Sequence, residues 1–450
     1  MRRILYRVPG LVFSYHFALS LLGALFFGFP SRKLHVIGVT GTKGKTTVLE
    51  LMDAVLSAAG KKTALLSSLR VKIGDREEKN TSENTMPGRF FIQRFLRRAV
   101  REGCRYALLE VTSQGVAQHR HRFINWSAAF LINIHPEHIE AHGSYEKYRA
   151  AKLEFLKYAV SKGAEIFINR DDRESEFFTR ALRGAHLALY SKDESLAARL
   201  GAASRDIKRG AREKPSEFYS ADFNRENAAA AASLAANLGI DDRTVLRALG
   251  GFEGLPGRVE FIPAFVKTSA GKQQEPFTVV IDYAHTPDSL RAVYAALRGQ
   301  MTNDKLPMTN SHESSVVSHK LICVLGSAGG GRDKWKRPEM GRIAASYCDA
   351  IVFTDEDPYD ENPESIVADI ENGARENPRF QSAQLASMTW RILDRREAIR
   401  TAVSIAVAGD IVVVTGKGSE SWIHLAGGRK IPWSEKETVE TILRENKTAP

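Results

Sequence analysis

The sequence predicts an α/β protein with two open, mostly parallel sheets. Short apolar runs rich in β-branched residues predict buried strands, and segments with helical spacing of their apolar residues follow them. Such alternation is typical of parallel sheets whose faces are covered by helices. Leu255-Pro256-Gly257 lies between the two halves of the chain and is a natural hinge. In the second half the expected strands are 278–281, 320–325, 350–353 and 410–415.

A glycine-rich loop after the first expected strand is the clearest motif. Residues 34–39 are apolar, Gly-Thr-Lys-Gly-Lys-Thr-Thr follows at 41–47, and 48–59 have helical spacing. Strand, loop and helix together are the context of a phosphate-binding loop (P-loop), whose N–H groups and helix dipole face the phosphates. The glycines at 38, 41 and 44 are expected to give the tight turn, Lys45 to reach the outer phosphates and Thr46 to bind Mg²⁺. The sequence therefore predicts an ATP site formed by Gly41, Thr42, Lys43, Gly44, Lys45, Thr46 and Thr47.

Composition indicates an ordinary multidomain enzyme. A chain of 450 residues with 43% hydrophobic and 26% charged residues is typical of a soluble enzyme of two or three domains. The net charge of +11 suits a polyanionic substrate, and a basic proteome or a weak attraction to membranes explains it equally well. Cys104, Cys323 and Cys348 are odd in number and far apart, so we expect neither a disulfide nor a metal site from them. This pattern fits the cytoplasm, and we expect no nucleic-acid partner.

Residues 1–33 are a short apolar N-terminal segment. Met1-Arg2-Arg3 precede an apolar stretch, 8–29, whose composition imitates a signal peptide or a membrane helix. Polar residues interrupt this stretch, no small-residue cleavage site follows it, and basic residues flank both of its ends. We therefore expect a helix that is docked on the protein or lies on the inner face of the membrane, with a true span as the alternative.

Two polar segments follow expected strands in the first half. Glu110 ends the strand 106–111, where an α/β sheet places a metal-binding acid, although an acid that caps the next turn has the same pattern. Residues 135–142, His-Pro-Glu-His-Ile-Glu-Ala-His, contain three histidines and two glutamates. They indicate metal or phosphate chemistry or simply a polar surface, and their spacing alone does not single out His138.

Together, the motifs resemble the Mur ligases, the ATP-dependent enzymes that add amino acids during peptidoglycan synthesis. The type that adds the third residue, the UDP-N-acetylmuramoyl-tripeptide synthetase (MurE) type, is the most similar, and DYAHTP with RDKWKRP is the most specific part of the match. The segments that carry the resemblance are GVTGTKGKTT (38–47), LEVTSQG (109–115), INIHPEHIEAHGSYEKYRAAK (132–152), INRDD (168–172), FNRENAAAAASLA (223–235), LPGRVE (255–260), VIDYAHTPDSL (280–290), GSAGGGRDKWKRPEMG (326–341), TDEDPYDENP (354–363) and GKGSE (416–420).

The resemblance implies a P-loop central domain over 34–255 and a C-terminal Rossmann-like α/β domain over 256–450. It implies an ADP-forming ligase that joins an amino acid to a peptidoglycan precursor through an acyl phosphate, with ATP and Mg²⁺ as cofactors. Lys45, Lys152 and His138 would be catalytic, and Thr46, Glu110, His138 and a carbamate on Lys152 would bind the metal. By its pattern alone, Lys152 would be an ordinary surface lysine. The further implied nucleotide contacts are Asn227, Arg258, Asp282 and His285, and the implied substrate contacts are Thr85, Ser113, Arg332, Glu356, Asp357, Gly416 and Glu420.

Besides a minor change at Lys43, where many members have asparagine, the sequence departs from the family pattern in three places. Only 33 residues precede the P-loop strand, so we expect the usual UDP-binding domain to be missing. Met86 follows Thr85 where a second threonine is usual, and Tyr359 stands where diaminopimelate-adding members have arginine. Another Mur-like ligase of the folylpolyglutamate synthase type is one alternative, which DYAHTP and RDKWKRP disfavour. A non-catalytic nucleotide-binding subunit is the other, and the retained metal-binding residues argue against it.

Overall fold

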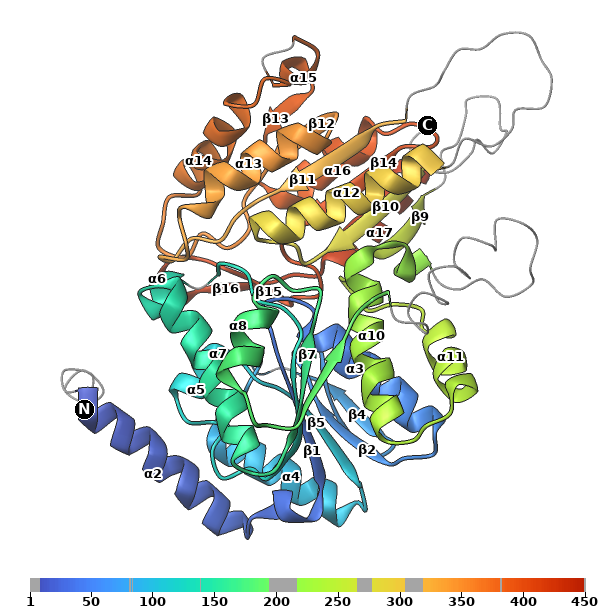
Figure 1. The fold of residues 1–450 in the computed structure, drawn as a ribbon. Helices are drawn as coiled ribbons and strands as arrows, with labels where there is room; N and C mark the ends of the chain where they lie inside the picture. The colour runs from blue at the N-terminus through green and yellow to red at the C-terminus, as the bar shows by residue number, and fades with distance from the viewer. Residues whose placement is uncertain are drawn as a thin grey trace. The chain divides into compact units, whose positions relative to one another are not determined.

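The computed structural model describes residues 9–80, 82, 84–137, 139–193, 217–264, 277–303, 319–380 and 383–448. They form two compact units, residues 1–253 and 254–450. Each unit is an open sheet with helices on both faces (Figure 1), so the predicted α/β class is confirmed. Residues 267–276 and 301–318 are polar and poor in hydrophobic residues, which predicts two surface loops. His138, residues 267–276 and residues 304–318 lie outside the described residues. Residues 301–303 end helix α12 and are not part of a loop.

The first unit is built on an eight-stranded sheet in the order β4-β3-β2-β5-β1-β6-β7-β8. Strands β3 and β4 form an antiparallel edge, and the other neighbours run parallel. Because β1 lies between β5 and β6, the loops that follow these three strands meet at one edge of the sheet. The sequence analysis missed β4, because all four of its residues are charged and exposed. The strands are β1 (His35–Thr40), β2 (Thr63–Leu66), β3 (Arg70–Ile73), β4 (Arg76–Lys79), β5 (Tyr106–Glu110), β6 (Trp126–Leu131), β7 (Glu165–Asn169) and β8 (Leu187–Tyr190).

Helices cover both faces of this sheet. Val36 of β1 points into the core under α4, α5, α7 and α8, whereas Ile37 and Val39 point into the core under α3, α10 and α11. The spacing of apolar residues predicts a helix over 89–102 with Phe91, Phe95 and Leu96 pointing inward. In α4 Phe95 and Leu96 are buried, but Phe91 is 41% exposed. The helices are α3 (Lys45–Ala58), α4 (Arg89–Arg101), α5 (Ser113–Ala117), α6 (Ile139–His142), α7 (Tyr145–Val160), α8 (Ser175–Ala181), α10 (Asp222–Asn237) and α11 (Asp242–Gly250), with short 3₁₀ turns at Pro30–Lys33 and Glu217–Ser220.

The apolar N-terminal segment forms helix α2 (Pro9–Phe27), which packs against the first unit. The hydroxyl of Ser20 donates a hydrogen bond to the carbonyl oxygen of His119 at 2.8 Å. The ring centroid of Phe17 lies 5.1 Å from that of Phe123. Gly23 lies beside the beginning of α4, where a Cβ would make an ordinary contact with the Phe90 ring at 3.6 Å. Within the described part of the chain, no helix is both long and apolar enough to cross a membrane.

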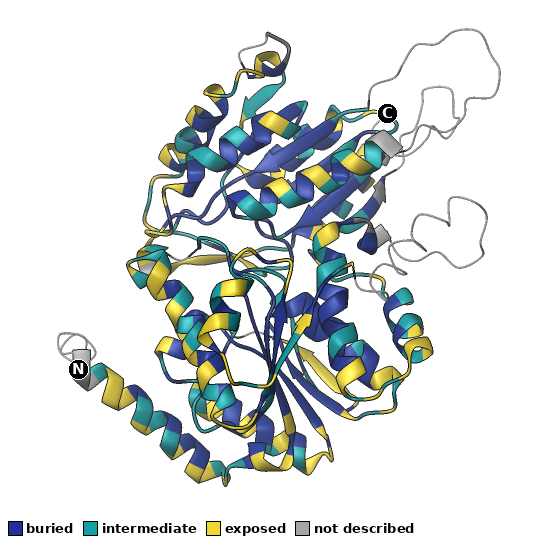
Figure 2. Cartoon of the chain, in the orientation of Figure 1, coloured by how far each residue is buried: buried dark blue, intermediate teal, exposed yellow. Residues whose placement is uncertain are grey.

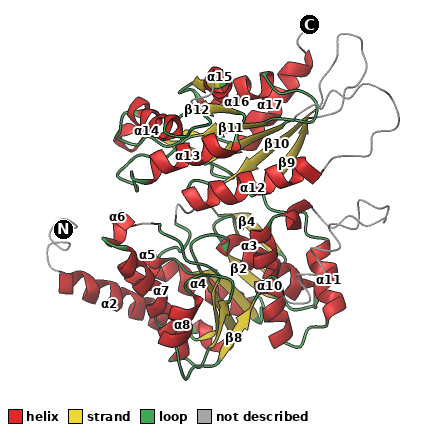
Figure 3. Ribbon diagram, turned by 45° about the horizontal axis from the view of Figure 1, so that its top comes forward, coloured by secondary structure: helices red, strands yellow, loops and turns green. Residues whose placement is uncertain are grey.

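The second unit has a six-stranded sheet in the order β13-β12-β11-β14-β10-β9, in which only β9 runs antiparallel to its neighbour. Helices α12, α13 and α14 lie on one face and α16 and α17 on the other (Figure 3). The four strands expected from the sequence are β10, β11, β12 and β14, and the loops after them share one edge. The elements are β9 (Glu260–Ala264), β10 (Phe277–Asp282), α12 (Pro287–Asn303), β11 (Leu321–Leu325), α13 (Lys336–Tyr347), β12 (Ala350–Phe353), α14 (Pro363–Arg375), α15 (Ala383–Ser387), β13 (Thr389–Arg391), α16 (Arg395–Ser404), β14 (Ile411–Thr415), β15 (Trp422–His424), a 3₁₀ turn (Ala426–Gly428), β16 (Lys430–Pro432) and α17 (Glu435–Thr448).

Cys323 and Cys348 form a disulfide, which shows that the expectation of unpaired cysteines was wrong. Cys323 lies in β11, and Cys348 follows α13 two residues before β12 begins. Because β11 and β12 are neighbouring parallel strands joined by a helical crossover, residues 25 apart in the sequence come within 6.1 Å, measured between their Cα atoms. Cys104 is a buried free thiol.

Candidate active site

Two glycines of the P-loop have close neighbours that exclude a side chain. Gly44 begins α3 with φ of 82°, a left-handed conformation, and a Cβ there would lie 2.5 Å from Oδ1 of Asn227. A Cβ on Gly41 would overlap the side chain of Ile132. The loop therefore fits tightly between the end of β6 and helix α10, and Asn227, which the resemblance implies as a nucleotide contact, lies beside it.

Gly38 has a different role from the one expected. It belongs to β1 and not to the turn, and a Cβ there would lie 2.7 Å from ring atoms of both Trp126 and Phe155. The absence of a side chain at Gly38 lets these two aromatic rings pack against the P-loop strand. Of the three glycines in the pattern, Gly38 is therefore needed for packing, and Gly41 and Gly44 are needed for the loop.

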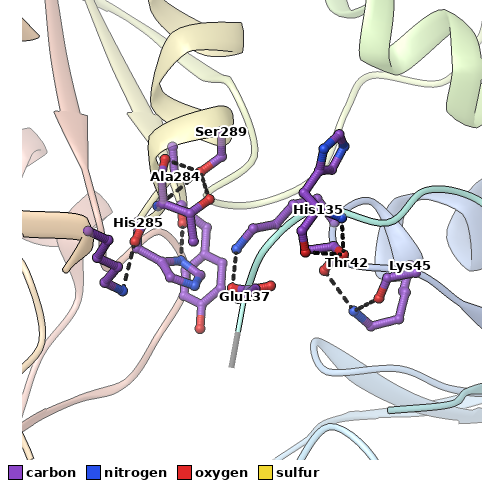
Figure 4. A network of polar contacts seen from close by, with 12 residues as sticks. Thr42, Lys45, His135, Glu137, Ala284, His285 and Ser289 are labelled. Atoms are coloured by element: carbon purple, nitrogen blue, oxygen red, sulfur yellow. Dashed lines mark hydrogen bonds and ion pairs between the residues drawn. The ribbon is translucent and has the colours of Figure 1, made fainter. Parts of the chain in front are cut away.

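Three lysines point into the P-loop region (Figure 4 shows Lys45). Nζ of Lys45 donates hydrogen bonds to the carbonyl oxygens of Gly41 and Thr42, both at 3.0 Å. Nζ of Lys152, from the middle of α7, donates to the same Gly41 oxygen at 2.8 Å. Lys43 forms an ion pair with Glu137 at 2.8 Å. Lys45 and Lys152, which are far apart in the sequence, therefore meet at one backbone oxygen.

The end of β6 holds the P-loop through residues that the sequence analysis did not identify. The side-chain oxygen of Asn133 accepts hydrogen bonds from the backbone N–H groups of Thr42 and Lys43, both at 2.9 Å. The hydroxyls of Thr42 and Tyr148 lie 2.9 Å apart, and the N–H of His135 donates to Thr42 Oγ1 at 2.9 Å. Asn133, Tyr148 and His135 lie inside motifs that were quoted for the resemblance, but no local pattern distinguishes their roles.

Thr46 and Glu110 lie together, as the sequence analysis expected. The Thr46 hydroxyl donates to Oε1 of Glu110 at 2.7 Å, and the same oxygen accepts from the N–H of Ser68 at 2.8 Å. Ser68, at the end of β2, also places its hydroxyl 2.8 Å from that of Thr46. The Thr46 hydroxyl and the buried Glu110 carboxylate are hard oxygen ligands of the kind that Mg²⁺ prefers. Across the described residues, no group of three or more His, Cys, Asp and Glu side chains could hold a metal ion, so a magnesium site here needs other ligands as well.

Lys152 is almost completely buried, at 1% exposure, and is not the surface lysine that its pattern alone predicts. Burial lowers the pKa of Lys152 well below its usual value, the charge of Lys45 lowers it further, and Glu137 opposes both. The lysine pair therefore favours a neutral amine at Lys152 beside a charged Lys45.

The expected acceptor-side residues, Thr85 and Ser113, lie in the loop before α4 and at the beginning of α5. Oγ of Ser113, in the first turn of α5, lies 3.0 Å from Nε2 of His142. Thr85 lies in the loop before α4, and Met86 after it is buried, with its sulfur where a Cβ on Gly115 would be. Thr47 is buried in the first turn of α3.

The nucleotide contacts implied for the second unit are each held by contacts with neighbouring residues. Asp282, at the end of β10, accepts from the N–H groups of Val259 at 2.8 Å and Ala284 at 2.6 Å. The guanidinium of Arg258 lies 4.1 Å from the ring centroid of Tyr283. Nδ1 of His285 lies 2.7 Å from the Tyr283 carbonyl oxygen, and Figure 4 shows His285 in this loop.

A buried charged cluster lies at the carboxyl ends of β12 and β14. Lys417 Nζ contacts both oxygens of Asp357, at 2.9 and 3.0 Å, and Oε2 of Glu420 at 2.6 Å. Oε2 of Glu356 has no hydrogen-bond partner among the described residues, and it lies where a Cβ on Gly416 would clash. Burial raises the pKa of Glu356 to about 7, with a further contribution from Asp357. The structure thus brings Glu356, Asp357, Gly416 and Glu420 together, with Lys417 as a central cation that the sequence analysis missed.

Arg332 and Tyr359 form a pair at the edge of this cluster. Nη2 of Arg332 donates to the Tyr359 hydroxyl at 2.7 Å, and its guanidinium lies 4.9 Å from the ring centroid. The two lysines that could replace the missing arginine have other contacts. Lys334 pairs with Glu361 at 3.1 Å, and Lys336 donates to the His285 carbonyl oxygen at 3.0 Å.

Comparison with known proteins assigns both units to one family. The model of the Mur ligase middle domain matches residues 39–235, and that of the Mur ligase glutamate ligase domain matches residues 258–418. The UDP-N-acetylmuramoyl-L-alanyl-D-glutamate–2,6-diaminopimelate ligase of Thermosynechococcus vestitus is 33% identical, and the match covers 96% of this chain and 81% of the relative. The UDP-N-acetylmuramyl-tripeptide synthetase of a Roseiflexus species is also 33% identical, over 95% of this chain and 82% of the relative.

Solved structures of similar fold include members of the same family. A UDP-N-acetylmuramoyl-L-alanyl-D-glutamate–2,6-diaminopimelate ligase has 25% identity and a TM-score of 0.54 over 92% of this chain and 79% of its own. The Mycobacterium tuberculosis folylpolyglutamate synthase, complexed with ADP and AMPPCP, has 18% identity and a TM-score of 0.61 over 92% of this chain and 94% of its own, a likeness of fold alone. From these matches and from the P-loop geometry, the chain belongs to the Mur ligase family of ATP-dependent, ADP-forming amide ligases.

Proposed function

We propose that this protein adds the third residue of the peptidoglycan stem peptide to a UDP-N-acetylmuramoyl-dipeptide or a related acceptor. Two relatives that match over nearly the whole chain carry names of this activity. The observation that carries the proposal is the meeting of Lys45 and Lys152 at the Gly41 carbonyl oxygen, beside the Thr46–Glu110 pair. We expect the reaction to take place in the cytoplasm, where ATP is available.

The chemistry needs two steps. In the first, a carboxylate of the acceptor attacks the γ-phosphorus of ATP, which forms an acyl phosphate and releases ADP. In the second, the amine of the incoming amino acid attacks the acyl carbon, phosphate leaves and the amine loses a proton. The protein contributes by positioning reactants and by balancing charge. In this proposal Lys45 and the N–H groups of Gly44 to Thr47 hold the phosphates.

Mg²⁺ would be held by Thr46 and Glu110, with His138, which lies outside the described residues, as a further ligand. When bound, it would neutralise charge on the phosphates. Lys152 fits a carbamate for two reasons on the molecule itself. Its buried, low-pKa amine is available to attack CO₂, and a carbamate would replace the repulsion between two lysines by an attraction to Lys45.

The remaining candidate residues divide between the two units. Thr85 and Ser113 of the first unit are proposed to contact the acceptor. In the second unit, Asp282, His285 and Arg258 are proposed to contact the nucleotide, together with Asn227 of the first. The amino acid would meet the cluster of Glu356, Asp357, Gly416 and Glu420, while Arg332 would hold its α-carboxylate.

A ligation assay tests the proposal. The protein, ATP and Mg²⁺ are incubated with UDP-N-acetylmuramoyl-dipeptide and a panel of amino acids, and ADP release and product mass are measured. We expect ADP release that depends on both acceptor and amino acid, and its loss in Lys45→Ala but not in Lys61→Ala, a lysine after α3 outside the loop. Glutamate addition to a folate acceptor instead would favour the folylpolyglutamate synthase type. Absence of turnover with every acceptor would favour a non-catalytic subunit.

A further inference from the structure

Helix α2 turns a continuous apolar face outward. Its 19 residues include no Asp, Glu, Lys or Arg. The exposed side chains of Tyr15, Ala18, Leu22, Leu25 and Phe26 recur at helical spacing and form one stripe along the helix. Figure 2 shows exposed positions along the length of α2. Phe26 is 77% exposed, and Leu22 and Leu25 are each 54% exposed. Scattered exposed apolar residues are normal on a protein surface, but a contiguous row of them indicates an interaction site.

Helix α4, which packs beside α2, extends this face and adds positive charge. Phe90 and Phe91 at its beginning are exposed, and the ring centroid of Phe90 lies 6.4 Å from that of Phe26. Farther along α4, the outward side carries Arg94, Arg97, Arg98 and Arg101. In the part of the chain that the structure describes, none of these four arginine side chains forms an ion pair or a hydrogen bond. The helix contains no acidic residue.

The apolar and the basic surfaces meet in one groove. It has a volume of about 640 Å³, with the residues Leu25 to Gly28 on one side and the four arginines of α4 on the other. The apolar side of the groove suits an acyl chain. The arginine side suits a phosphate, because guanidinium groups donate paired hydrogen bonds to phosphate oxygens.

We propose that α2 and α4 form a docking surface for a bilayer that contains anionic phospholipids. In this arrangement α2 lies in the plane of the interface, with Leu22, Leu25 and Phe26 among the upper acyl chains and the α4 arginines at the headgroup phosphates. Buried apolar area and attraction of basic residues to anionic lipid are the two contributions that hold such helices at a membrane. A second copy of this chain fits the face less well, since a two-fold interface would bring the four unpaired arginines of each copy toward those of the other.

Vesicle co-sedimentation of the full chain tests the proposal. We expect binding to vesicles of phosphatidylcholine mixed with phosphatidylglycerol, and much weaker binding to phosphatidylcholine alone. The double variant Arg94→Gln/Arg98→Gln should bind roughly 25-fold more weakly, about fivefold for each arginine, and wild-type binding should weaken with added salt. Phe26→Ser should bind these vesicles more weakly by a factor on the order of ten or more, because the phenyl ring would no longer be buried in the bilayer.

Matched variants on other exposed surfaces are the controls. Arg243→Gln/Arg247→Gln on α11 and Val407→Ser in the second unit change the same kinds of residue, and should bind as wild type does. All these side chains are exposed, so the variants should fold, which circular dichroism checks. Equal binding by wild type and Arg94→Gln/Arg98→Gln, or no binding to anionic vesicles, overturns the proposal. A dimer in sedimentation velocity that Phe26→Ser dissociates would identify the face as a self-interface and overturn it too.

Discussion

Lys152 and Lys45 both donate hydrogen bonds to the carbonyl oxygen of Gly41, at 2.8 and 3.0 Å. Two ammonium groups at one acceptor repel each other, and the one that is more deeply buried loses its proton more easily. The pKa of Lys152 is lowered accordingly, first by burial and then by Lys45. The two lysines at this oxygen therefore differ in the ease with which they lose a proton.

Lys152→Ala should therefore abolish ligation while the protein stays folded. We expect kcat to fall on the order of hundredfold or more, because a ligand-forming group would be lost. Added bicarbonate and excess Mg²⁺ should not restore activity. Lys157→Ala, an exposed lysine on the same helix, is the control and should keep wild-type turnover. With ¹³C-bicarbonate, wild type should show a carbamate signal that Lys152→Ala lacks, and near-normal turnover in Lys152→Ala would rule out the carbamate role.

Thr46 and Glu110 give a prediction about metal dependence. Glu110→Gln keeps the shape of the side chain but removes its charge, so the concentration of Mg²⁺ that gives half-maximal ligation should rise by roughly tenfold or more. Ser68→Ala removes only a neighbouring hydroxyl, whose hydrogen bond to Thr46 is worth about 1 kcal/mol. Its Mg²⁺ requirement should therefore change much less. The measurement is a Mg²⁺ titration at fixed ATP, and the same requirement in Glu110→Gln and wild type would contradict the assignment.

Local patterns explain why the P-loop could be predicted and its supports could not. The P-loop is a local motif, because its strand, glycines, lysine and helix follow one another directly in the sequence. A short stretch of sequence is therefore enough to predict its geometry. Asn133 and Tyr148 reach the loop only because β6 and α7 pack beside β1, which no spacing reveals. Thr46 and Glu110 could be paired in advance, since the loops after neighbouring parallel strands meet.

The failed expectations have the same origin. Gly38 belongs to the glycine pattern, but its neighbours Trp126 and Phe155 come from distant elements. The Cys323–Cys348 pair depends on the adjacency of β11 and β12 and not on sequence separation. Phe91 lies on the same face of α4 as the exposed Arg94 and Arg98, whereas Ile92 beside it is buried.

Glu356 should make stability depend on pH. Burial raises its pKa to about 7 from an ordinary value of 4.5, Asp357 raises it too, and Lys417, Arg395 and Lys336 oppose this shift. Between these pH values the folded state binds more protons at Glu356 than the unfolded state, so the free energy of unfolding falls as pH rises. The loss from this group is about 3 kcal/mol and is complete above pH 7. The neighbouring Asp355, with a pKa raised by burial to about 6, acts in the same direction.

Glu356→Gln should remove this part of the pH dependence. Denaturant unfolding at pH 5 and pH 8 measures it, and the variant should lose less stability between the two than wild type does. Glu437→Gln changes an exposed glutamate of the same unit, and its free energy of unfolding should fall between pH 5 and pH 8 as much as that of wild type. If Glu356→Gln and wild type lost the same free energy of unfolding between pH 5 and pH 8, Glu356 would be ionised in the folded state throughout this range.

The last prediction concerns which amino acid the enzyme adds, and it depends on Tyr359. Recognition of diaminopimelate requires a cation for its second carboxylate, and a guanidinium provides two parallel hydrogen bonds. Tyr359 offers a hydroxyl whose pKa is raised by burial, so it stays neutral, and Arg332 already donates to it. Lys334 and Lys336 contact Glu361 and the His285 carbonyl. We therefore expect lysine or a neutral amino acid to be preferred over diaminopimelate.

Competition between lysine and meso-diaminopimelate in the ligation assay measures this preference. Relatives named as diaminopimelate ligases match over nearly the whole chain, so the prediction depends on the change at this one position and not on overall similarity. Tyr359→Arg should move the ratio of products toward diaminopimelate by roughly tenfold or more, because a charged hydrogen bond contributes about 1.5–3 kcal/mol. Tyr359→Phe adds no cation and should keep the wild-type preference. If wild type clearly selects diaminopimelate, another cation must serve its second carboxylate, and the argument from Tyr359 is wrong.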